Sequence, residues 1–417
     1  MNPNIAANQQ RLFLEFFGEL RPHLRRDSAL PRRIKEIFAR NRAIGSRDRK
    51  LYRELVYTAL RFLPWVEYWL DRDPQLAAKI TAWLAPELKP TSAYRLAHCG
   101  DWPPAPTTLA EKAKTLAVVV SVGRESLPES LFDPRSLLPA WFRDHCPAAF
   151  ESPHLDALNS RANVWVRIQC KERSLVFDEF RSQGWSYATS PDFPDAISLP
   201  PNAEVANSDA YRRGFVEIQD LGSQMVLAHA LISPGQRWLD ACAGAGGKTL
   251  QLSRLLGAQG RVDATDIRVE ILDELADRAK RARLSNISIV RAAEDVYDGV
   301  LVDAPCSGSG TWRRQPHLKW YVKPETIASF HATQLQILTA NAKHVRPGGL
   351  LVYATCSLSH CENQDLAAEF LRSHSQFKPE APPQGFGGEF DGIGTSLLPG
   401  THNTDGFYVA TLRRQSS

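Results

Sequence analysis

Between Gln219 and Cys356, short apolar segments alternate regularly with segments of helical periodicity. This alternation constrains the fold more than any other feature, because strands that are connected by helices pair in parallel and carry helices on both faces of their sheet. The segment 268–284 shows the amphipathic helical pattern most clearly. We therefore predict an α/β fold with a parallel, doubly wound sheet. Its predicted strands are residues 237–242, 260–266, 286–292, 299–305 and 348–356.

The residues before this sheet divide into two further regions. Residues 1–85 place apolar side chains three and four positions apart, which is the spacing of helices. Residues 163–169 and 195–200 alternate like strands, and residues 174–184 resemble a short helix that ends on glycine. A segment rich in proline and serine, at about 100–135, separates the two regions. The sequence predicts three domains: an all-α domain with its linker at residues 1–130, a small α+β domain at 131–215 and an α/β domain at 216–417.

The composition limits the class of protein. A chain of 417 residues that is 43% hydrophobic can bury the cores of two or three globular domains. We expect no membrane segment, because no apolar run approaches the roughly 20 residues that span a bilayer. The N-terminus lacks the layout of a secretory signal. Seven irregularly spaced cysteines argue against a disulfide framework and favour a reducing, cytoplasmic location.

Positive charge is concentrated near the beginning of the chain. Residues 1–70 hold 14 Lys and Arg against 7 Asp and Glu, whereas the net charge of the whole chain is only +4. A basic, helical region suggests a polyanion as partner. A solvated helix surface would give the same surplus, so the charge leaves both interpretations open.

Three glycines follow the first predicted strand, in the segment DACAGAGGKT at residues 240–249. Such a turn lets the backbone approach a ligand and leaves helix N–H groups free to bind it. A phosphate-binding P-loop is excluded, because Cys242 stands where its first glycine is required. Asp266 ends the second predicted strand, where an acidic residue can accept hydrogen bonds from a ribose. A dinucleotide and S-adenosylmethionine both fit this pattern.

Two cysteines lie at the ends of two predicted strands. Asp303 ends one strand and Cys306 follows it, and Cys356 ends another. Because neighbouring parallel strands end side by side, we expect these side chains to share one pocket. A loop of serine and glycine follows Cys306, and the Trp-Arg-Arg sequence at 312–314 would suit contacts with bases and phosphates.

This pair of cysteines suits the methylation of an aromatic carbon. C5 of cytosine is too weak a nucleophile to attack a methylsulfonium group unless a thiolate first adds to C6. A single free cysteine is more often a packing residue, but two that are each followed by serine, with Asp303 adjacent, favour catalysis. Cys361 lacks a second pair of ligands at zinc spacing, so we expect no metal. The side chains of the other cysteines are predicted to be structural: Cys99, Cys146, Cys170 and Cys242. The backbone of Cys242 is nevertheless expected to contact a cofactor.

Several segments resemble the RsmB/NOP class of RNA (cytosine-5) methyltransferases. SRDRKLYRELVYTALR at 46–61 resembles the NusB-like RNA-binding domain of bacterial members, and NVWVRIQ at 163–169 resembles the start of their small middle domain. EIQDLGSQ at 217–224 resembles the segment before the first strand of the catalytic domain. The catalytic motifs that carry the resemblance are DACAGAGGKT, DAPCSGSGTWRR at 303–314, HLKW at 317–320, VRPGGLLVYATCSL at 345–358 with Glu362-Asn363 after it, and LLPGTHNTDGFYVATLRR at 397–414.

The resemblance implies a fold, a cofactor and roles for particular residues. It implies a C-terminal Rossmann-like domain that methylates RNA with S-adenosylmethionine. Cys356 would be the nucleophile, Cys306 would assist release of the methylated base, and Asp303 would contact the base at the edge of the cofactor. Asp266 would bind the ribose. The implied cofactor-binding residues are Cys242, Ala243, Gly244, Ala245, Gly246, Gly247, Lys248, Asp266 and Asp303.

The sequence departs from the family at two points of the cofactor site. Ala245 replaces the usual proline of the glycine turn, which loosens the loop but leaves its glycines, so we expect binding to survive. The family's acidic residue on the adenine side falls near Ala293, in a segment shorter than usual. Glu294 or Asp295 would have to substitute for it.

The leading hypothesis is an enzyme that makes 5-methylcytosine in structured RNA, with ribosomal RNA as the expected substrate and transfer RNA as the alternative. A catalytically weak RNA-binding assembly factor is a second hypothesis, although binding alone needs neither thiol. Methylation of DNA cytosine is a third, because Ala-Pro-Cys at 304–306 imitates the proline–cysteine motif of DNA enzymes. RNA is the expected partner, without membrane or metal, and we expect a monomer.

Overall fold

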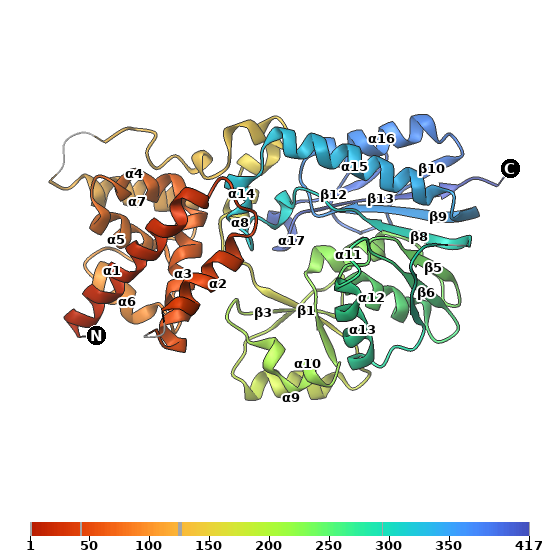
Figure 1. The fold of residues 1–417 in the computed structure, drawn as a ribbon, viewed down its shortest axis with the longest axis horizontal. Coiled ribbons are helices and arrows are strands. Elements are labelled where there is room, and N and C mark those ends of the chain that lie inside the picture. The colour runs from red at the N-terminus through yellow and green to blue at the C-terminus, as the bar shows by residue number, and fades with distance from the viewer. Residues whose placement is uncertain (1, 42–43, 124–126, 294, 417) are drawn as a thin grey trace. The chain divides into compact units, whose positions relative to one another are not determined.

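The computed structural model describes residues 2–41, 44–123, 127–293 and 295–416 (Figure 1). Within these ranges, no helix combines the length and the hydropathy of a membrane span. The chain forms two compact units, which we call the helical unit and the sheet unit. The helical unit consists of Met1–Arg161 together with Trp312–Lys323, and the sheet unit of Ala162–Thr311 together with Pro324–Ser417.

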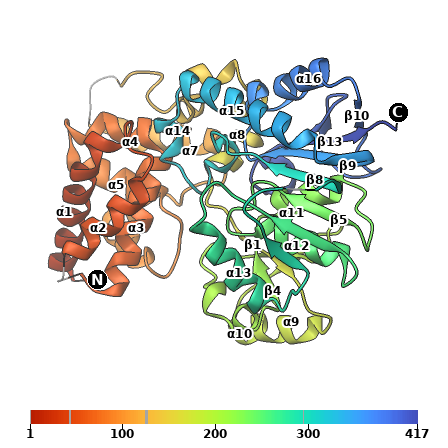
Figure 2. The ribbon, with the colours of Figure 1, turned by 45° about the vertical axis from the view of Figure 1, so that its right-hand side comes forward.

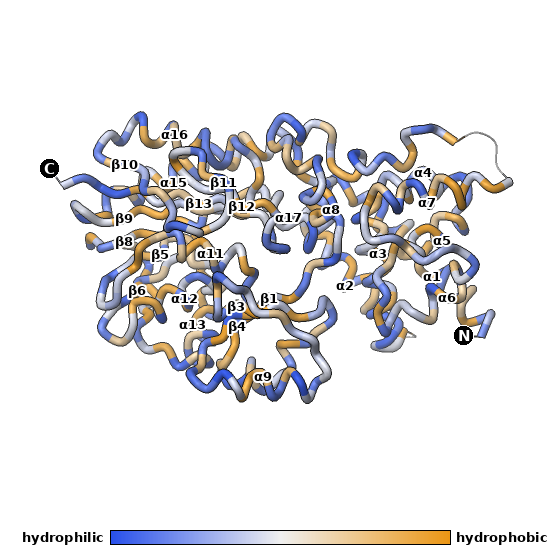
Figure 3. The backbone as a smooth tube through the Cα atoms, turned by 180° about the vertical axis from the view of Figure 1, so that it is seen from behind, coloured by the Kyte–Doolittle hydropathy of each residue, from blue (hydrophilic) through white to orange (hydrophobic). Residues whose placement is uncertain are grey.

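The helical unit confirms the helices predicted within residues 1–85. In α3 (Ser46–Arg61), the apolar side chains of Leu51, Leu55 and Ala59 recur every four residues and are buried. Orange and blue segments accordingly alternate along the helices of this unit in Figure 3, as amphipathic helices require. Its other helices are α1 (Pro3–Leu20), α2 (Leu30–Arg40), α4 (Leu63–Leu70), α5 (Pro74–Leu84), α6 (Ser92–Cys99), α7 (Leu109–Ser121), α8 (His154–Leu158) and α14 (Leu318–Tyr321).

A short segment from the later part of the chain, Trp312–Lys323, belongs to the helical unit. The side chain of Lys319 is fully buried there. Its Nζ donates to the carbonyl oxygens of Arg61 (2.9 Å) and Leu137 (3.0 Å) and to Oδ1 of Asn159 (2.7 Å). Burial lowers the pKa of Lys319 well below its ordinary value. Because this one side chain joins residues on both sides of position 130, the predicted domain boundary at 130 falls inside a compact unit.

Trp312 and Arg313 are buried in this unit, so the predicted contacts of these two residues with RNA are wrong. Trp312 is 0% exposed and Arg313 is 1% exposed. The indole ring lies 4.6 Å from the ring of Phe142, measured between centroids, and the carbonyl oxygen of Arg313 accepts a hydrogen bond from Arg61 at 3.0 Å. The side chains of Trp312 and Arg313 therefore pack inside the unit, whereas Arg314 is half-buried.

The sheet unit begins with a small antiparallel sheet, as the alternating segments predicted. β1 (Val164–Ile168) pairs with β3 (Ala196–Leu199) on one side and with β4 (Val216–Ile218) on the other. Val166 of β1 is fully buried in a core that includes Phe180 of the neighbouring helix. The remaining elements are β2 (Ala188–Thr189), α9 (Arg173–Ser182) and α10 (Asp209–Arg212).

The large sheet contains every predicted parallel strand. These strands are β5 (Arg237–Asp240), β6 (Arg261–Ala264), β7 (Ile287–Ile289), β8 (Tyr297–Asp303) and β9 (Val345–Thr355). Their order is β7-β6-β5-β8-β9, and all pair in parallel. Figure 2 labels β5, β8 and β9 of this sheet. The chain order reverses at β5, so the carboxyl ends of β5 and β8 flank the switch point at which such sheets bind ligands.

Helices cover both faces of the large sheet. α11 (Leu221–His229) and α12 (Gly247–Leu256) pack against one face, and α15 (Pro324–Ala342) and α16 (Gln364–Ser373) pack against the other. α13 (Ile271–Arg281) packs beside the end of β6. The sheet is therefore doubly wound, as predicted.

The sheet is not purely parallel, which corrects the prediction. β13 (Phe407–Arg414) runs antiparallel beside β9, and its residues are almost all buried. The C-terminal tail thus pairs with a strand edge that would otherwise be open. The remaining elements of this antiparallel extension are β10 (Phe377–Glu380), β11 (Glu389–Phe390), β12 (Thr395–Leu397) and α17 (Pro399–His402).

Candidate active site

A cavity of about 920 Å³ lies at the switch point of the large sheet, beside the carboxyl ends of β5 and β8 and helix α15. Its volume is typical of a small-molecule site. All the predicted cofactor-binding residues line it except Gly246. Cys306 lines the cavity as well, and Cys356 contacts Cys306 without being part of the lining. The sequence did not indicate the contribution of α15, which includes Phe330 and Ile337.

The glycine turn has the backbone that its composition predicted. Gly244 has a φ of +51° and Gly246 a φ of +89°, which residues with side chains rarely adopt. A Cβ atom at Gly246 would also lie 2.7 Å from Cγ of Leu275 on α13. Gly246 therefore lets α12 and α13 pack closely, while its neighbours face the cavity. The first N–H groups of α12, which begins at Gly247, have no partners within the helix and can bind a ligand.

Asp266 lies two residues beyond the end of β6 and holds the glycine turn. Its carboxylate accepts hydrogen bonds from the backbone N–H groups of Gly244 (2.8 Å) and Arg268 (2.9 Å). Burial tends to raise the pKa of Asp266, but the hydrogen bonds from Arg268 and Gly244 outweigh it and lower the pKa below its ordinary value. An ionised carboxylate at the edge of the cavity is thus available to a ribose.

Two further carboxyl groups lie at the strand ends that flank the cavity. Asp303 forms an ion pair with Lys248, with 2.8 Å between Oδ2 and Nζ. Asp240 ends β5, and its Oδ2 accepts a hydrogen bond from Thr249 at 2.7 Å. Its Oδ1 is buried and has no hydrogen-bond partner among the described residues. Burial raises the pKa of Asp240 to about 7.

The unpartnered oxygen of Asp240 fits a bound cofactor that brings its own donor groups. Asp240 lines the cavity beside the open first turn of α12. S-adenosylmethionine carries an ammonium group and hydroxyl groups, which are donors of this kind. The sequence analysis did not single out Asp240, although a buried polar residue at the end of an apolar strand was a usable signal.

The two predicted catalytic cysteines are brought together. Cys306 and Cys356 follow β8 and β9, and their sulfur atoms are 3.3 Å apart. Both are free thiols and half-buried. The hydrogen bond with Cys356, burial and the nearby Glu362 raise the pKa of the Cys306 thiol well above its ordinary value.

A buried carboxylate supports the two cysteine loops. Glu362 is 0% exposed. Ser307 and Ser357, which directly follow the two cysteines, both donate their hydroxyl groups to Oε2 of Glu362 at 2.5 Å. Glu362 was expected as part of a family motif, not as a partner of both loops.

The structure does not support Asp295 as the replacement for the family's acidic residue on the adenine side of the cofactor. Asp295 forms an ion pair with Arg237 at 2.7 Å. Arg237 begins β5, so this pair lies at the opposite edge of the sheet from the glycine turn. Ala293 packs against the apolar core, and Glu294 lies outside the described residues.

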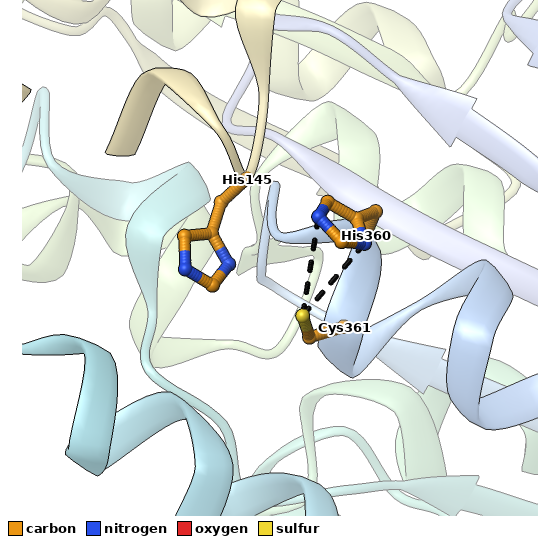
Figure 4. Close-up of side chains that lie close together, drawn as sticks. All are labelled: His145, His360 and Cys361. Atoms are coloured by element: carbon orange, nitrogen blue, oxygen red, sulfur yellow. Dashed lines mark hydrogen bonds between the residues drawn. The ribbon is translucent and has the colours of Figure 1, made fainter. Parts of the chain in front are cut away.

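Cys361 lies beside a histidine of its own short helix. It belongs to the 3-10 helix η7 (His360–Glu362), and its sulfur is 3.7 Å from Nδ1 of His360 (Figure 4). The Nδ1 atom also lies 2.6 Å from a carboxylate oxygen of Asp365. His145, the third side chain labelled in Figure 4, belongs to the helical unit. The expected absence of a metal remains a prediction.

The fold and the site define a class of protein. A Rossmann-like sheet carries a glycine turn after its first strand, an acidic residue after its second strand and a cavity at its switch point. These are the features of an S-adenosylmethionine-dependent methyltransferase domain. The antiparallel β13 beside the last parallel strand completes that domain.

Comparisons with known proteins identify the family. Residues 228–413 match the family described as 16S rRNA methyltransferase RsmB/F. The chain is 30% identical over 314 residues to ribosomal RNA small subunit methyltransferase B of Xylella fastidiosa, which covers 72% of each chain. It is 31% identical over 299 residues to the protein of the same name from Klebsiella pneumoniae, which covers 67% of this chain and 66% of the relative. This chain belongs to the RsmB/F methyltransferase family.

The comparison with solved structures supports the fold over the whole chain. The crystal structure of PH0851 matches with a TM-score of 0.72 and 20% identity, covering 99% of each chain. The predicted family resemblance and the cofactor S-adenosylmethionine are thus confirmed. A NusB-like character of the helical unit remains a prediction.

Proposed function

We propose that this chain methylates C5 of a cytosine in small-subunit ribosomal RNA through a reversible covalent bond between Cys356 and C6 of the base. One observation carries the proposal: the sulfur atoms of Cys306 and Cys356 are 3.3 Å apart, and Cys306 lines the cavity that contains the glycine turn. The name of the family and of the curated relatives supports ribosomal RNA as the substrate.

The first half of the reaction needs a nucleophile and an acid. The thiolate of Cys356 adds to C6 of cytosine, and the electron pair of the C5–C6 double bond moves toward C5 and N3. A hydrogen bond donated to N3 supports this shift. Asp303 lies near Cys306 at the end of β8, and it can donate once it has taken a proton from the ammonium group of Lys248, its ion-pair partner at 2.8 Å. S-adenosylmethionine, when bound by residues 242–248 and Asp266, supplies an electrophilic methyl group.

The second half of the reaction breaks the bond to the enzyme. The proton on C5 leaves to a base, its bonding electrons re-form the C5–C6 double bond, and the sulfur of Cys356 departs with the electron pair of the C6–S bond. Cys306 is suited to assist, because its raised pKa keeps it a neutral thiol that can donate a hydrogen bond to the departing sulfur. Ordinary turnover therefore needs both cysteines.

The product of the reaction tests the proposed function. The purified protein should transfer a labelled methyl group from S-adenosylmethionine to small-subunit ribosomal RNA, and nuclease digestion followed by mass spectrometry should yield 5-methylcytidine. Transfer RNA and double-stranded DNA serve as parallel substrates. Methylation of another atom, or of only transfer RNA or DNA, would contradict the proposal. Cofactor binding without methyl transfer to any of the three would favour an assembly factor.

Replacing Asp266 by alanine should weaken binding of S-adenosylmethionine by about 10- to 100-fold, since hydrogen bonds to a charged group contribute about 1.5–3 kcal/mol. The variant loses the acceptor for the ribose and the brace on Gly244. Calorimetric titration with the cofactor measures the effect. Asp295→Asn is the matched control, because that carboxylate pairs with Arg237 away from the cavity and its loss should leave the affinity unchanged. An unchanged affinity in Asp266→Ala would disprove the assignment.

A further inference from the structure

The carboxylate of Glu362 connects the two loops that carry the cysteines. Ser307 donates twice, from its backbone N–H to Oε1 at 2.8 Å and from its hydroxyl to Oε2 at 2.5 Å. Ser357 donates its hydroxyl to Oε2 at 2.5 Å, and Gln334 donates Nε2 to Oε1 at 3.0 Å. The residue after each cysteine is therefore bound to the same carboxyl group.

Hydrogen-bond donors surround the carboxyl group of Glu362. An ionised carboxyl group only accepts hydrogen bonds, and the four groups that reach Glu362 can all donate. These four donors are neutral, and the side chain is fully buried. Burying a negative charge among neutral partners costs free energy. A serine or an amide side chain at this position could make hydrogen bonds without that cost. A role limited to holding the two loops by hydrogen bonds would not need a charged side chain.

The carboxylate of Glu362 lies close enough to Cys306 to affect the pKa of its thiol. Cys306 is faced by Cys356, by Tyr353 of β9 and by Glu362. Asp303, which is paired with Lys248, lines the same cavity as Cys306. Glu362 is among the groups that raise the pKa of Cys306. Glu362 accepts two hydrogen bonds from the Cys306 loop and one from the Cys356 loop, and its charge disfavours a thiolate at Cys306.

We propose that Glu362 is a positioning residue that holds the sulfur atoms of Cys306 and Cys356 next to each other. Through its negative charge it determines which of the two is the nucleophile. Cys306 is the neutral thiol and Cys356 the attacking sulfur. This inference rests on the proposed function and deepens it. The hydrogen bonds fix the distance between the loops, and the charge selects the nucleophile.

Alkylation of the two cysteines tests the proposal without RNA or cofactor. The protein is treated with iodoacetamide from pH 7 to 9.5, and mass spectrometry follows each cysteine peptide. Because only the thiolate reacts, a pKa that falls by one unit raises the rate about tenfold below the pKa. In Glu362→Gln, which removes the charge and keeps the shape, the alkylation rate of Cys306 relative to Cys356 should rise about tenfold.

Two further variants separate the charge from the hydrogen bonds. Ser357→Ala removes one tether and keeps the carboxylate, so the relative alkylation rate of Cys306 should stay within about twofold of wild type. Glu362→Asp keeps the charge on a shorter side chain. It should also leave that rate ratio unchanged, but it should slow disulfide formation between Cys306 and Cys356 by diamide, which takes up the two thiol hydrogens. Glu362→Asp carries the test if Glu362→Gln does not fold, as judged by circular dichroism.

Turnover measurements complete the test. Glu362→Gln should lower kcat for methyl transfer about 10- to 100-fold, as expected when a group that supports catalysis is lost, and should leave the KM for S-adenosylmethionine unchanged. A folded Glu362→Gln protein with wild-type relative alkylation of Cys306, or a Glu362→Asp protein with wild-type disulfide formation, would overturn the role of Glu362. If the proposed 5-methylcytidine product is not found while the alkylation results hold, the proposed function fails and the role of Glu362 stands.

Discussion

Replacing Cys356 by alanine should abolish methyl transfer to RNA, with a loss in kcat of at least about 10³-fold. Without a thiolate to add to C6, C5 of cytosine is too weak a nucleophile to accept the methyl group. Cys306 lies 3.3 Å from Cys356, between the sulfur atoms. The variant removes the hydrogen bond that raises the pKa of Cys306 most, but burial and Glu362 still raise that pKa, so Cys306 should not act as a substitute. Transfer of labelled methyl groups to isolated ribosomal RNA measures the loss.

A neighbouring cysteine provides the matched control for this prediction. Cys361 is also a free, half-buried thiol in the loop region after β9, and the proposed mechanism does not use it. Cys361→Ala should therefore retain turnover within about twofold of wild type, as expected for a side chain outside the catalytic unit of residues. Both variants should bind S-adenosylmethionine normally. Turnover by Cys356→Ala near the wild-type level would refute Cys356 as the nucleophile.

Replacing Cys306 by alanine should instead trap the protein on its RNA. Addition of Cys356 and methyl transfer do not need Cys306, but release of the methylated base does, because the hydrogen bond to the departing sulfur is lost. The covalent complex should accumulate as a slowly migrating band on a denaturing gel and should carry the labelled methyl group. Multiple turnover should fall by about 10²- to 10⁴-fold, the range of acid–base contributions.

The double variant Cys306→Ala, Cys356→Ala is the control for trapping. It keeps the fold of the cavity but has neither sulfur, so no covalent band should form. The reverse pattern, in which Cys356→Ala traps the RNA and Cys306→Ala does not, would exchange the roles of the two cysteines. It would also reverse the role that we infer for Glu362.

The candidate site was largely predictable because its residues lie at strand ends. Gly244, Asp266, Cys306 and Cys356 each follow an apolar segment that could only be a buried strand of a parallel sheet. Parallel strands end at a common edge, so local patterns were enough to place these residues near one cavity. Asp240 carried the same signal but was missed, whereas Glu362 lacked it. Glu362 acts through partners 55 and 5 positions away, at Ser307 and Ser357.

The errors in the prediction arose where distant segments meet. The sequence 312–314 has the composition of a nucleic-acid contact, yet Trp312 and Arg313 are buried in the helical unit, where Arg313 accepts a hydrogen bond from Arg61, 252 positions away. The pairing of β13 with β9 likewise joins strands that are far apart in the chain. The pattern of residues within a segment does not predict which edge of a sheet that segment will pair with.

The sequence by itself determined the helices within residues 1–85, the parallel strands and their doubly wound sheet, and it placed the cysteines and carboxyl groups at strand ends, because the periodicity of apolar residues and the turn-forming residues act locally. Only the tertiary structure decided which buried partners the polar groups acquire. Lys319 satisfies carbonyl groups around residues 61, 137 and 159, and Glu362 joins the two cysteine loops. Such contacts depend on how a buried polar group finds donors and acceptors in three dimensions, since water is no longer available to it.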